Sequence, residues 1–208
     1  MIKNVIYIIA GMLVFFIGMI TYGIILNIRE VTLKEAMDEI KLTRLNNVYL
    51  VVNRKKYRLE LYSDSVLVKS YKAVFGKNTG TEKRAKDDYI TPIGEYKICS
   101  IDTASKFHKL FQINYPNEKD ATEAFRNNYI SKRDFFILQK TWGTDDCPAE
   151  NTPINTVIGI HGMGRFNFIF KNLPFSFNWT NGSVSVSDES VDELYPIIKI
   201  GTKVSIVY

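Results

Sequence analysis

The sequence contains few of the residues that carry metal or redox chemistry. Two cysteines, Cys99 and Cys147, and two histidines, His108 and His161, occur among 208 residues. The cysteines do not have the spacing of metal ligands, and they could either pair outside the cytoplasm or remain free thiols. The sequence therefore predicts no metal and no cofactor.

Long runs of one charge are also absent. The formal net charge is +5, and the sequence contains neither a cluster of Lys and Arg nor a nucleic-acid-binding motif. This small basic excess favours solubility over a nucleic-acid partner. The chain has 46% hydrophobic and 24% charged residues, without repeats or low-complexity segments, which is the composition of a folded protein.

One hydrophobic run is present near the N-terminus. It begins at Val5, ends at Ile28 and contains no charged residue. As a helix it would measure about 36 Å, enough to cross a hydrocarbon core of about 30 Å. A cleaved signal peptide is the alternative, but its apolar part is shorter and is followed by small residues at a cleavage site. We therefore expect a short tail and an uncleaved transmembrane anchor at residues 1–28, in contact with the lipid bilayer.

The residues after the anchor have a helical pattern. Apolar residues recur at helical intervals among charged ones between residues 29 and 46. This pattern predicts a helical stalk or linker, or else a continuation of the membrane helix. The charges on the two sides of the anchor are nearly balanced, so the positive-inside rule does not set its orientation.

From residue 47 the apolar residues alternate, as in β-strands. We predict one mainly β (α+β) domain over residues 47–208, with one or two short helices, preceded by one transmembrane helix. The expected strands are residues 48–52, 57–62, 66–75, 95–101, 134–139, 157–160, 183–186 and 203–207, and the expected helices are 120–127 and 189–198.

Two places could carry chemistry. His161 follows an apolar strand and precedes Gly162, a position that can face a cleft, although a structural histidine fits as well. His108 has no such context. Ser183 follows the pair Asn181-Gly182, a common hairpin turn, so Ser183 is either the first residue after a turn or a nucleophile activated by His161.

Five short motifs follow one another in a characteristic order between residue 47 and the C-terminus. They are Gly76-Lys77 after the first strands, Asp88-Tyr89-Ile90-Thr91-Pro92-Ile93-Gly94-Glu95-Tyr96, Ile113-Asn114-Tyr115-Pro116-Asn117, Ile158-Gly159-Ile160-His161-Gly162, and Asp188-Glu189-Ser190-Val191-Asp192-Glu193-Leu194-Tyr195 with Gly201-Thr202-Lys203-Val204. In this order they resemble the catalytic domain of the L,D-transpeptidase (YkuD-type) family of bacterial cell-wall enzymes. The resemblance implies an L,D-transpeptidase-like β-sandwich.

The family's catalytic signature pairs this histidine with a later S/T-H-G-C segment. The corresponding residues here are Thr180-Asn181-Gly182-Ser183, preceded by Trp179. Thr180 and Gly182 match, whereas Asn181 stands where many members have histidine. Ser183 occupies the position of the nucleophilic cysteine, and Ser185 the position of an arginine that many members carry.

The resemblance also implies an activity and its residues. Family members attack a peptidoglycan stem peptide before D-alanine, form a thioester, and transfer the acyl group to an amine in cell-wall cross-linking or remodelling. His161 would move the protons, and the backbone N–H groups of Gly182 and Ser183 would bind the oxyanion. The substrate-binding residues would be Gly162, Tyr115, Trp179, Thr180 and Asn181.

Three hypotheses follow from the serine. Ser183 is the nucleophile of an acyl transferase, because a Ser–His pair can work when a third group orients the base. Alternatively, the protein is an inactive relative that binds stem peptides as a scaffold or regulator. In the third hypothesis Cys147 has become the nucleophile. The family also implies a cytoplasmic N-terminus, with the C-terminal domain outside the cytoplasm and facing the peptidoglycan.

Overall fold

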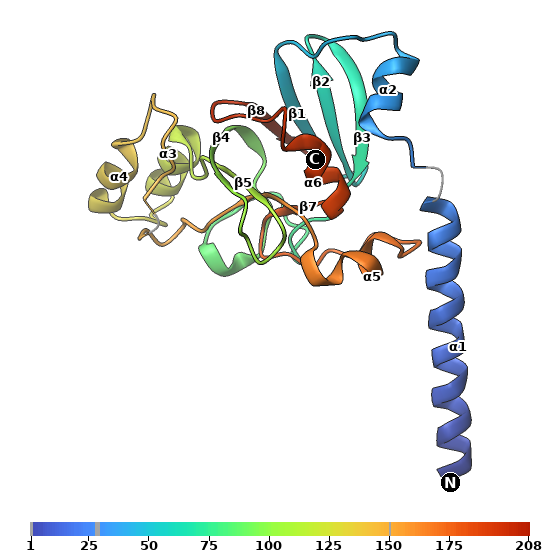
Figure 1. The fold of residues 1–208 in the computed structure, drawn as a ribbon. Helices are drawn as coiled ribbons and strands as arrows, with labels where there is room; N and C mark the ends of the chain where they lie inside the picture. Colours follow the sequence, from blue (N-terminus) through green and yellow to red (C-terminus); the bar gives the residue numbers. More distant parts are fainter. Residues whose placement is uncertain (1, 28–29, 150) are drawn as a thin grey trace.

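The computed structural model describes residues 2–27, 30–149 and 151–208. Helix α1 (Ile2–Asn27) projects from a domain of mixed α+β structure (Figure 1). The strands of the domain are β1 (Val48–Asn53), β2 (Arg58–Ser63), β3 (Val66–Lys72), β4 (Gly94–Asp102), β5 (Leu110–Ile113), β6 (Gly159–His161), β7 (Val184–Ser185) and β8 (Lys203–Val207). The helices are α2 (Leu33–Glu39), α3 (Glu118–Arg126), α4 (Lys132–Gln139), α5 (Asn167–Lys171) and α6 (Asp188–Leu194).

The strands form one mixed sheet in the order β3-β2-β1-β8-β4-β5-β6-β7. The pairs β1/β8 and β6/β7 are parallel, and the other neighbours are antiparallel. One cluster of buried side chains includes Leu50 of β1, Phe111 of β5, Ile160 of β6 and Leu194 of α6. Both halves of the sheet therefore pack around a common core with α6, and the predicted α+β fold class is confirmed.

The region between β5 and β6 has more helix than expected. The predicted strand at residues 134–139 is wrong, because α4 occupies this segment. Its start is fixed by a capping box in which the Ser131 hydroxyl accepts from the Asp134 N–H and the Asp134 carboxylate binds back to Ser131. Leu138 then packs against Ala121 and Ala124 of α3 in a second, smaller core. The apolar run after Asp134 is thus the buried face of a helix.

The predicted anchor and the predicted stalk form separate helices. Within the described residues α1 contains a span, Ile2–Leu26, that is long and apolar enough to cross a membrane, with a mean hydropathy of 2.4. The predicted anchor residue Ile28 and linker residue Arg29 lie outside the described residues. Helix α2 starts anew after the N-cap Thr32, so it does not continue α1.

Helix α2, which falls in the predicted stalk, lies against the domain. The Glu193 carboxylate of α6 accepts from the backbone N–H of Leu33 at 3.0 Å and from the Lys69 ammonium of β3 at 2.5 Å. Leu33 and Met37 also pack on the main core. The stalk is therefore attached to both β3 and α6.

Candidate active site

Two short parallel strands bring the candidate residues together. Ile160 of β6 lies opposite Val184 of β7, and His161 lies opposite Ser185. Ser183 precedes this pairing by one residue. Since alternate residues of a strand face the same side, Ser183 and His161 share one face of the sheet, offset by roughly 6–7 Å along the strands.

The hydrogen bonds of His161 define its tautomer. Its Nδ1 lies 2.6 Å from the carbonyl oxygen of Gly162, which can only accept, so Nδ1 carries the proton and Nε2 carries the lone pair. The Ser185 hydroxyl donates to the same carbonyl at 3.3 Å. Burial lowers the pKa of His161 to about 4. The imidazole is therefore neutral at pH 7, with a free lone pair on Nε2.

Aromatic side chains cover the imidazole. Phe107 stacks on it with ring centroids 4.7 Å apart, and Trp179 makes an edge contact at 5.8 Å. Phe170 of α5 packs on the outer side of Trp179. His161 is only 4% exposed as a result. The imidazole therefore lies between two aromatic rings.

The turn after His161 requires glycine. A Cβ on Gly162 would lie 2.3 Å from the Asp188 carboxylate and 2.8 Å from the carbonyl oxygen of Phe107. Asp188, at the start of α6, accepts from the backbone N–H groups of Met163 and Gly164 at 2.7 and 2.9 Å. The carboxylate thus holds the chain that positions the Gly162 carbonyl beneath the imidazole.

Thr180 closes the turn that leads to Ser183. Its hydroxyl donates to the Ser183 carbonyl at 2.6 Å and accepts from the Gly182 N–H at 3.2 Å. Gly182 has φ +121°, and a Cβ there would lie 2.9 Å from the carbonyl oxygen of Ile90. Position 182 therefore needs glycine. Thr180 itself is buried, so its contacts are those of a turn-forming residue.

The Ser183 hydroxyl is bound to the neighbouring strand. It accepts from the backbone N–H of Gly159 at 3.3 Å. Within the described part of the chain, no hydrogen bond joins Ser183 to His161. Activation of the serine would need its hydroxyl to form a new hydrogen bond to Nε2. Likewise, the Gly182 N–H would have to leave Thr180 to bind an oxyanion.

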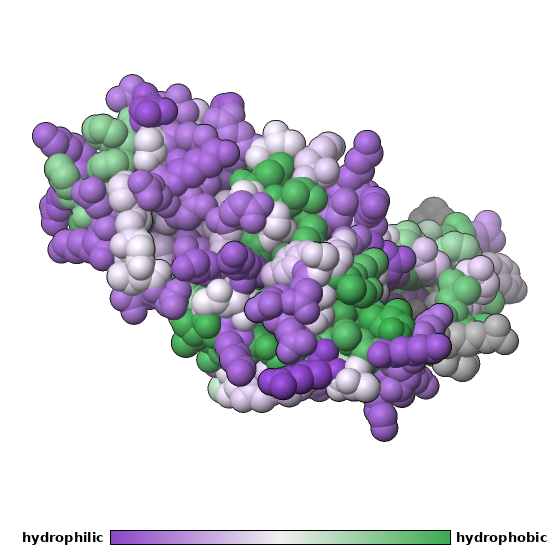
Figure 2. All heavy atoms as spheres, turned by 90° about the horizontal axis from the view of Figure 1, so that it is seen from above, coloured by the Kyte–Doolittle hydropathy of each residue, from purple (hydrophilic) through white to green (hydrophobic). Residues whose placement is uncertain are grey.

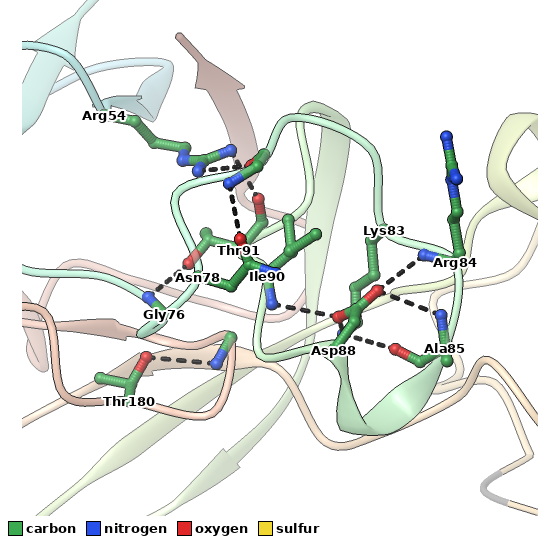
Figure 3. Close-up of polar contacts among 12 residues, drawn as sticks. Arg54, Gly76, Asn78, Lys83, Arg84, Ala85, Asp88, Ile90, Thr91 and Thr180 are labelled. Atoms are coloured by element: carbon green, nitrogen blue, oxygen red, sulfur yellow. Dashed lines mark hydrogen bonds and ion pairs between the residues drawn. The ribbon is translucent and has the colours of Figure 1, made fainter.

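The loop at residues 76–91 lies beside the turn that begins at Thr180, and Gly76 forms a bridge with Thr180 (Figure 3). The Gly76 N–H donates to the Thr91 hydroxyl, and the buried Arg54 guanidinium donates to the Thr91 and Gly80 carbonyls at 2.9 and 2.7 Å. A Cβ on Gly76 would lie 3.2 Å from the Cα of Gly182. The loop and the turn are therefore in direct contact.

Asp88 organises this loop (Figure 3). Its carboxylate accepts from the backbone N–H groups of Arg84, Ala85 and Ile90 at 2.7–3.1 Å and from the Lys83 ammonium at 2.6 Å. Burial alone would raise the pKa of Asp88, but these hydrogen bonds outweigh it and lower the pKa. The side chain of Lys83 is 2% exposed, and burial lowers its pKa.

The remaining predicted residues lie in different environments. Asn181 is exposed, and its side-chain oxygen accepts from the Lys77 ammonium at 3.3 Å. Tyr115 is 2% exposed and packs edge-on against Tyr96 in the core, so a direct contact with substrate has no support in the structure. The imidazole of His108 pairs with Asp192 at the surface, although its Cβ lies close to Gly162.

The structure excludes one candidate nucleophile. Cys147 forms a disulfide with Cys99 of β4, with the Cα atoms 5.1 Å apart. A disulfide sulfur is not a thiolate, and the hypothesis that Cys147 replaces the family nucleophile is therefore wrong. Among the described residues, no group of three or more His, Cys, Asp or Glu could hold a metal ion.

Sequence reasoning missed three residues at this site. Phe107 covers His161 from a loop far away in sequence, which no local pattern indicates. Asp188 was noted only as the first residue of the last motif, and its bonds to Met163 and Gly164 depend on the packing of α6. The partnership of Lys83 with Asp88 had one signal, the spacing of a basic and an acidic residue within a polar loop.

Comparisons with known proteins agree with this fold. The chain matches the family model of the L,D-transpeptidase catalytic domain, YkuD, over residues 47–206. No curated protein matches it in sequence. Similar solved structures include Bd1075 of Bdellovibrio bacteriovorus, with 18% identity and a TM-score of 0.48 over 78% of this chain and 48% of that chain.

Two other structures are similar to a comparable degree. The helical cell shape determining protein Pgp2 of Campylobacter jejuni has 15% identity and a TM-score of 0.46, over 85% of this chain and 55% of that chain. An L,D-transpeptidase of Xylanimonas cellulosilytica has 16% identity and a TM-score of 0.42, over 79% and 62%. The chain thus spans less than two thirds of each of these three structures. Because the family model covers most of the chain, the protein belongs to the L,D-transpeptidase (YkuD) catalytic domain family.

Proposed function

We propose that the protein is a membrane-anchored acyl transferase that acts on peptidoglycan stem peptides, with Ser183 as nucleophile and His161 as base. One observation carries this assignment: the Nδ1–H of His161 is bound to the Gly162 carbonyl, so the basic Nε2 remains available on the face that carries Ser183. This tautomer gives the imidazole a basic nitrogen beside the position of the family nucleophile.

The reaction follows from the chemistry of the family. The Ser183 oxygen attacks the carbonyl carbon that precedes D-alanine, and Nε2 takes the hydroxyl proton. The proton then passes to the leaving amine, D-alanine departs, and an ester on Ser183 remains. An acceptor amine attacks this ester, loses its proton to Nε2 and releases the serine. The backbone N–H groups of Gly182 and Ser183 stabilise the oxyanion in both steps.

The anchor and the disulfide support an extracytoplasmic domain. Helix α1 contains an apolar span of 25 residues, which is sufficient to cross a bilayer. The Cys99–Cys147 disulfide fits an oxidising compartment. With a cytoplasmic N-terminus, the domain faces the cell wall. A reporter fused after Tyr208 should be active outside the cytoplasm, and a cytoplasmic reporter signal would refute both the orientation and the substrate.

A second candidate function is binding of stem peptides without turnover. The observation in its favour is that the Ser183 hydroxyl contacts the Gly159 N–H instead of His161. A hydroxyl is also a weaker nucleophile than a thiolate, and a misplacement of about 1 Å can cost roughly 100-fold in rate.

The two functions differ in one measurement. The full chain in detergent is incubated with tetrapeptide muropeptides, and loss of D-alanine is followed by liquid chromatography and mass spectrometry. The transferase predicts D-alanine release that disappears in Ser183→Ala and His161→Gln, whereas His108→Gln retains it. The binding function predicts that the wild type binds muropeptides but releases no D-alanine, whereas Ser183→Cys does release it.

A further inference from the structure

Apolar side chains are exposed over a short segment between the two candidate residues. We call residues 166–177, which include α5, the aromatic segment. Its exposed apolar side chains are Phe166 (39%), Phe168 (61%), Ile169 (44%), Phe175 (51%) and Phe177 (54%). Soluble surfaces rarely gather so many large apolar groups unless something covers them.

The aromatic segment lies beside the end of the anchor. A Cβ on Gly23 of α1 would lie 1.7 Å from the carbonyl oxygen of Asn172, so the two backbones are in contact. Figure 1 shows α5 and the chain after it next to the C-terminal end of α1. Gly23 is three residues from Leu26, the end of the membrane span, or about 4.5 Å along a helix. The segment therefore lies at the depth where the anchor leaves the hydrocarbon core.

The junction between the anchor and the aromatic segment is basic as well as apolar. It contains a cavity of about 350 Å³. Lys72 lies at this junction and donates to the carbonyl of Leu173 at 2.7 Å. Basic groups at this depth attract anionic headgroups, and aromatic rings are enriched there. The charged residues that line the cavity are Arg58, Lys72, Glu30 and Lys171, which pairs with Glu189, and the apolar lining includes Phe175 and Phe177.

We propose that the aromatic segment is a second membrane contact, in which Phe168, Phe175 and Phe177 enter the headgroup region of an anionic phospholipid bilayer beside the anchor. The inference rests on the proposed membrane anchor. It adds that this edge of the domain is held against the bilayer, so that the domain does not turn freely about the anchor. Through Phe170, which packs on Trp179, the lipid contact reaches the side chains that cover His161.

The opposite end of the domain provides a matched control. Figure 2 shows that the end of the upper face farthest from the anchor is mostly hydrophilic, whereas apolar residues gather toward the middle and the anchor side. Phe136 of α4 is 52% exposed, close to the 51% of Phe175, and belongs to the region of α3 and α4 that Figure 1 places far from α1.

Photocrosslinking tests the contact directly. Benzoylphenylalanine replaces Phe15, Phe136, Phe175 or Phe177, one at a time, in the full chain reconstituted in nanodiscs of phosphatidylethanolamine and phosphatidylglycerol. After irradiation, intact-protein mass spectrometry detects the added mass of a lipid. We expect lipid adducts at positions 175 and 177, as at the anchor position 15, and several-fold less adduct at position 136.

The possible results distinguish a failure of the second membrane contact from a failure of the membrane anchor. Lipid adducts at position 15 without adducts at 175 and 177 overturn the second contact and leave the anchor standing. Adducts joining two protein chains at 175 or 177 also overturn it, because the segment would then face another copy. The absence of lipid adducts at position 15 as well would remove both the anchor and the contact.

Discussion

Burial gives His161 the properties of a neutral base. Phe107 and Trp179 pack against the imidazole, and the Gly162 carbonyl selects the tautomer with a free Nε2. Water exclusion lowers the pKa of His161 to about 4. An ordinary histidine titrates near 6.5 and is partly charged in mildly acidic surroundings. His161 keeps its lone pair across this range while the cover is closed.

The titration of His161 can be observed by NMR. In the free protein, the imidazole carbon–proton signal of His161 should move with a midpoint near pH 4, because burial penalises the charged ring. A His108→Gln variant assigns the signal, since only two histidines are present. A midpoint near 6.5 would contradict a buried imidazole and the aromatic cover.

The same shift couples stability to pH. As pH falls from 6.5 to 4, the unfolded chain takes up a proton at His161 before the folded chain does, so stability is lost in this window. Asp120 acts in the opposite direction, because burial raises its pKa to about 6 and the folded chain binds its proton first. A comparison with His161→Gln removes the contribution of Asp120, which both proteins share.

The expected result is a difference between two pH profiles. From pH 7 to pH 5, the free energy of unfolding of the wild type should fall by roughly 2 kcal/mol relative to His161→Gln. Urea unfolding of the full chains in detergent at the two pH values measures this. Parallel profiles for the two proteins would mean that His161 titrates normally in the folded state.

Sequence alone identified the two candidate residues but not their surroundings. The glycines beside His161 and Ser183 suggested a cleft and a turn, and the structure adds that both glycines are tightly packed: Gly162 against Asp188, and Gly182 against Ile90. The cover over His161 combines Phe107 and Trp179 from distant loops. Such contacts depend on the tertiary packing of the loops. The spacing of apolar residues along the sequence does not indicate it.

At the scale of elements, the loop at residues 76–91 depends on one buried ion pair. Lys83 is almost fully buried, and Asp88 is its carboxylate partner. Asp88→Asn would leave a buried ammonium without a counter-charge, and we expect it to lower the free energy of unfolding by roughly 2–4 kcal/mol. Lys83→Met in the Asp88→Asn background should recover much of this loss, because the uncompensated charge is then removed.

Urea unfolding of the single and double variants measures this coupling. The control is Glu82→Gln, the same chemical change at a nearby carboxylate whose ion pair with Arg84 is exposed on both sides. It should leave stability unchanged, as is usual for surface pairs. Equal effects of Asp88→Asn and Glu82→Gln would show that the buried pair does not hold the loop.

Local sequence predicted some elements and misassigned others. Strands β1, β2 and β8 were predicted because their apolar residues alternate along the sequence, and the structure buries every second residue of each. Helix α4 was predicted as a strand because its apolar run is short, and the Ser131–Asp134 capping box that starts it was overlooked. Strand β5 was not predicted. Its four residues are stabilised as a strand by pairing with β4 and β6, which a local sequence pattern does not show.

At the scale of the whole molecule, the disulfide joins the main sheet to the helical region. Cys99 belongs to β4 and Cys147 follows α4, with a sequence separation of 48. Closing a loop of this length stabilises a fold by roughly 4 kcal/mol in the chain-entropy model. The replacement of both residues, Cys99→Ser with Cys147→Ser, should lower the free energy of unfolding by up to this amount.

Alkylation shows whether the bond forms. Denatured, unreduced full-length protein should take up no iodoacetamide, and reduced protein should take up two equivalents, as read by intact mass. Two free thiols in protein purified from membranes without reductant would contradict both the disulfide and the assignment to an oxidising compartment.

The central claim is that Ser183 carries the acyl group of a stem peptide. The most direct measurement is the intact mass of the full chain after rapid mixing with a tetrapeptide substrate and acid quenching. We predict an added mass equal to the substrate without D-alanine, located on Ser183 by peptide mapping and absent in Ser183→Ala. Unmodified wild-type protein under conditions in which Ser183→Cys becomes acylated would contradict a catalytic role for this serine.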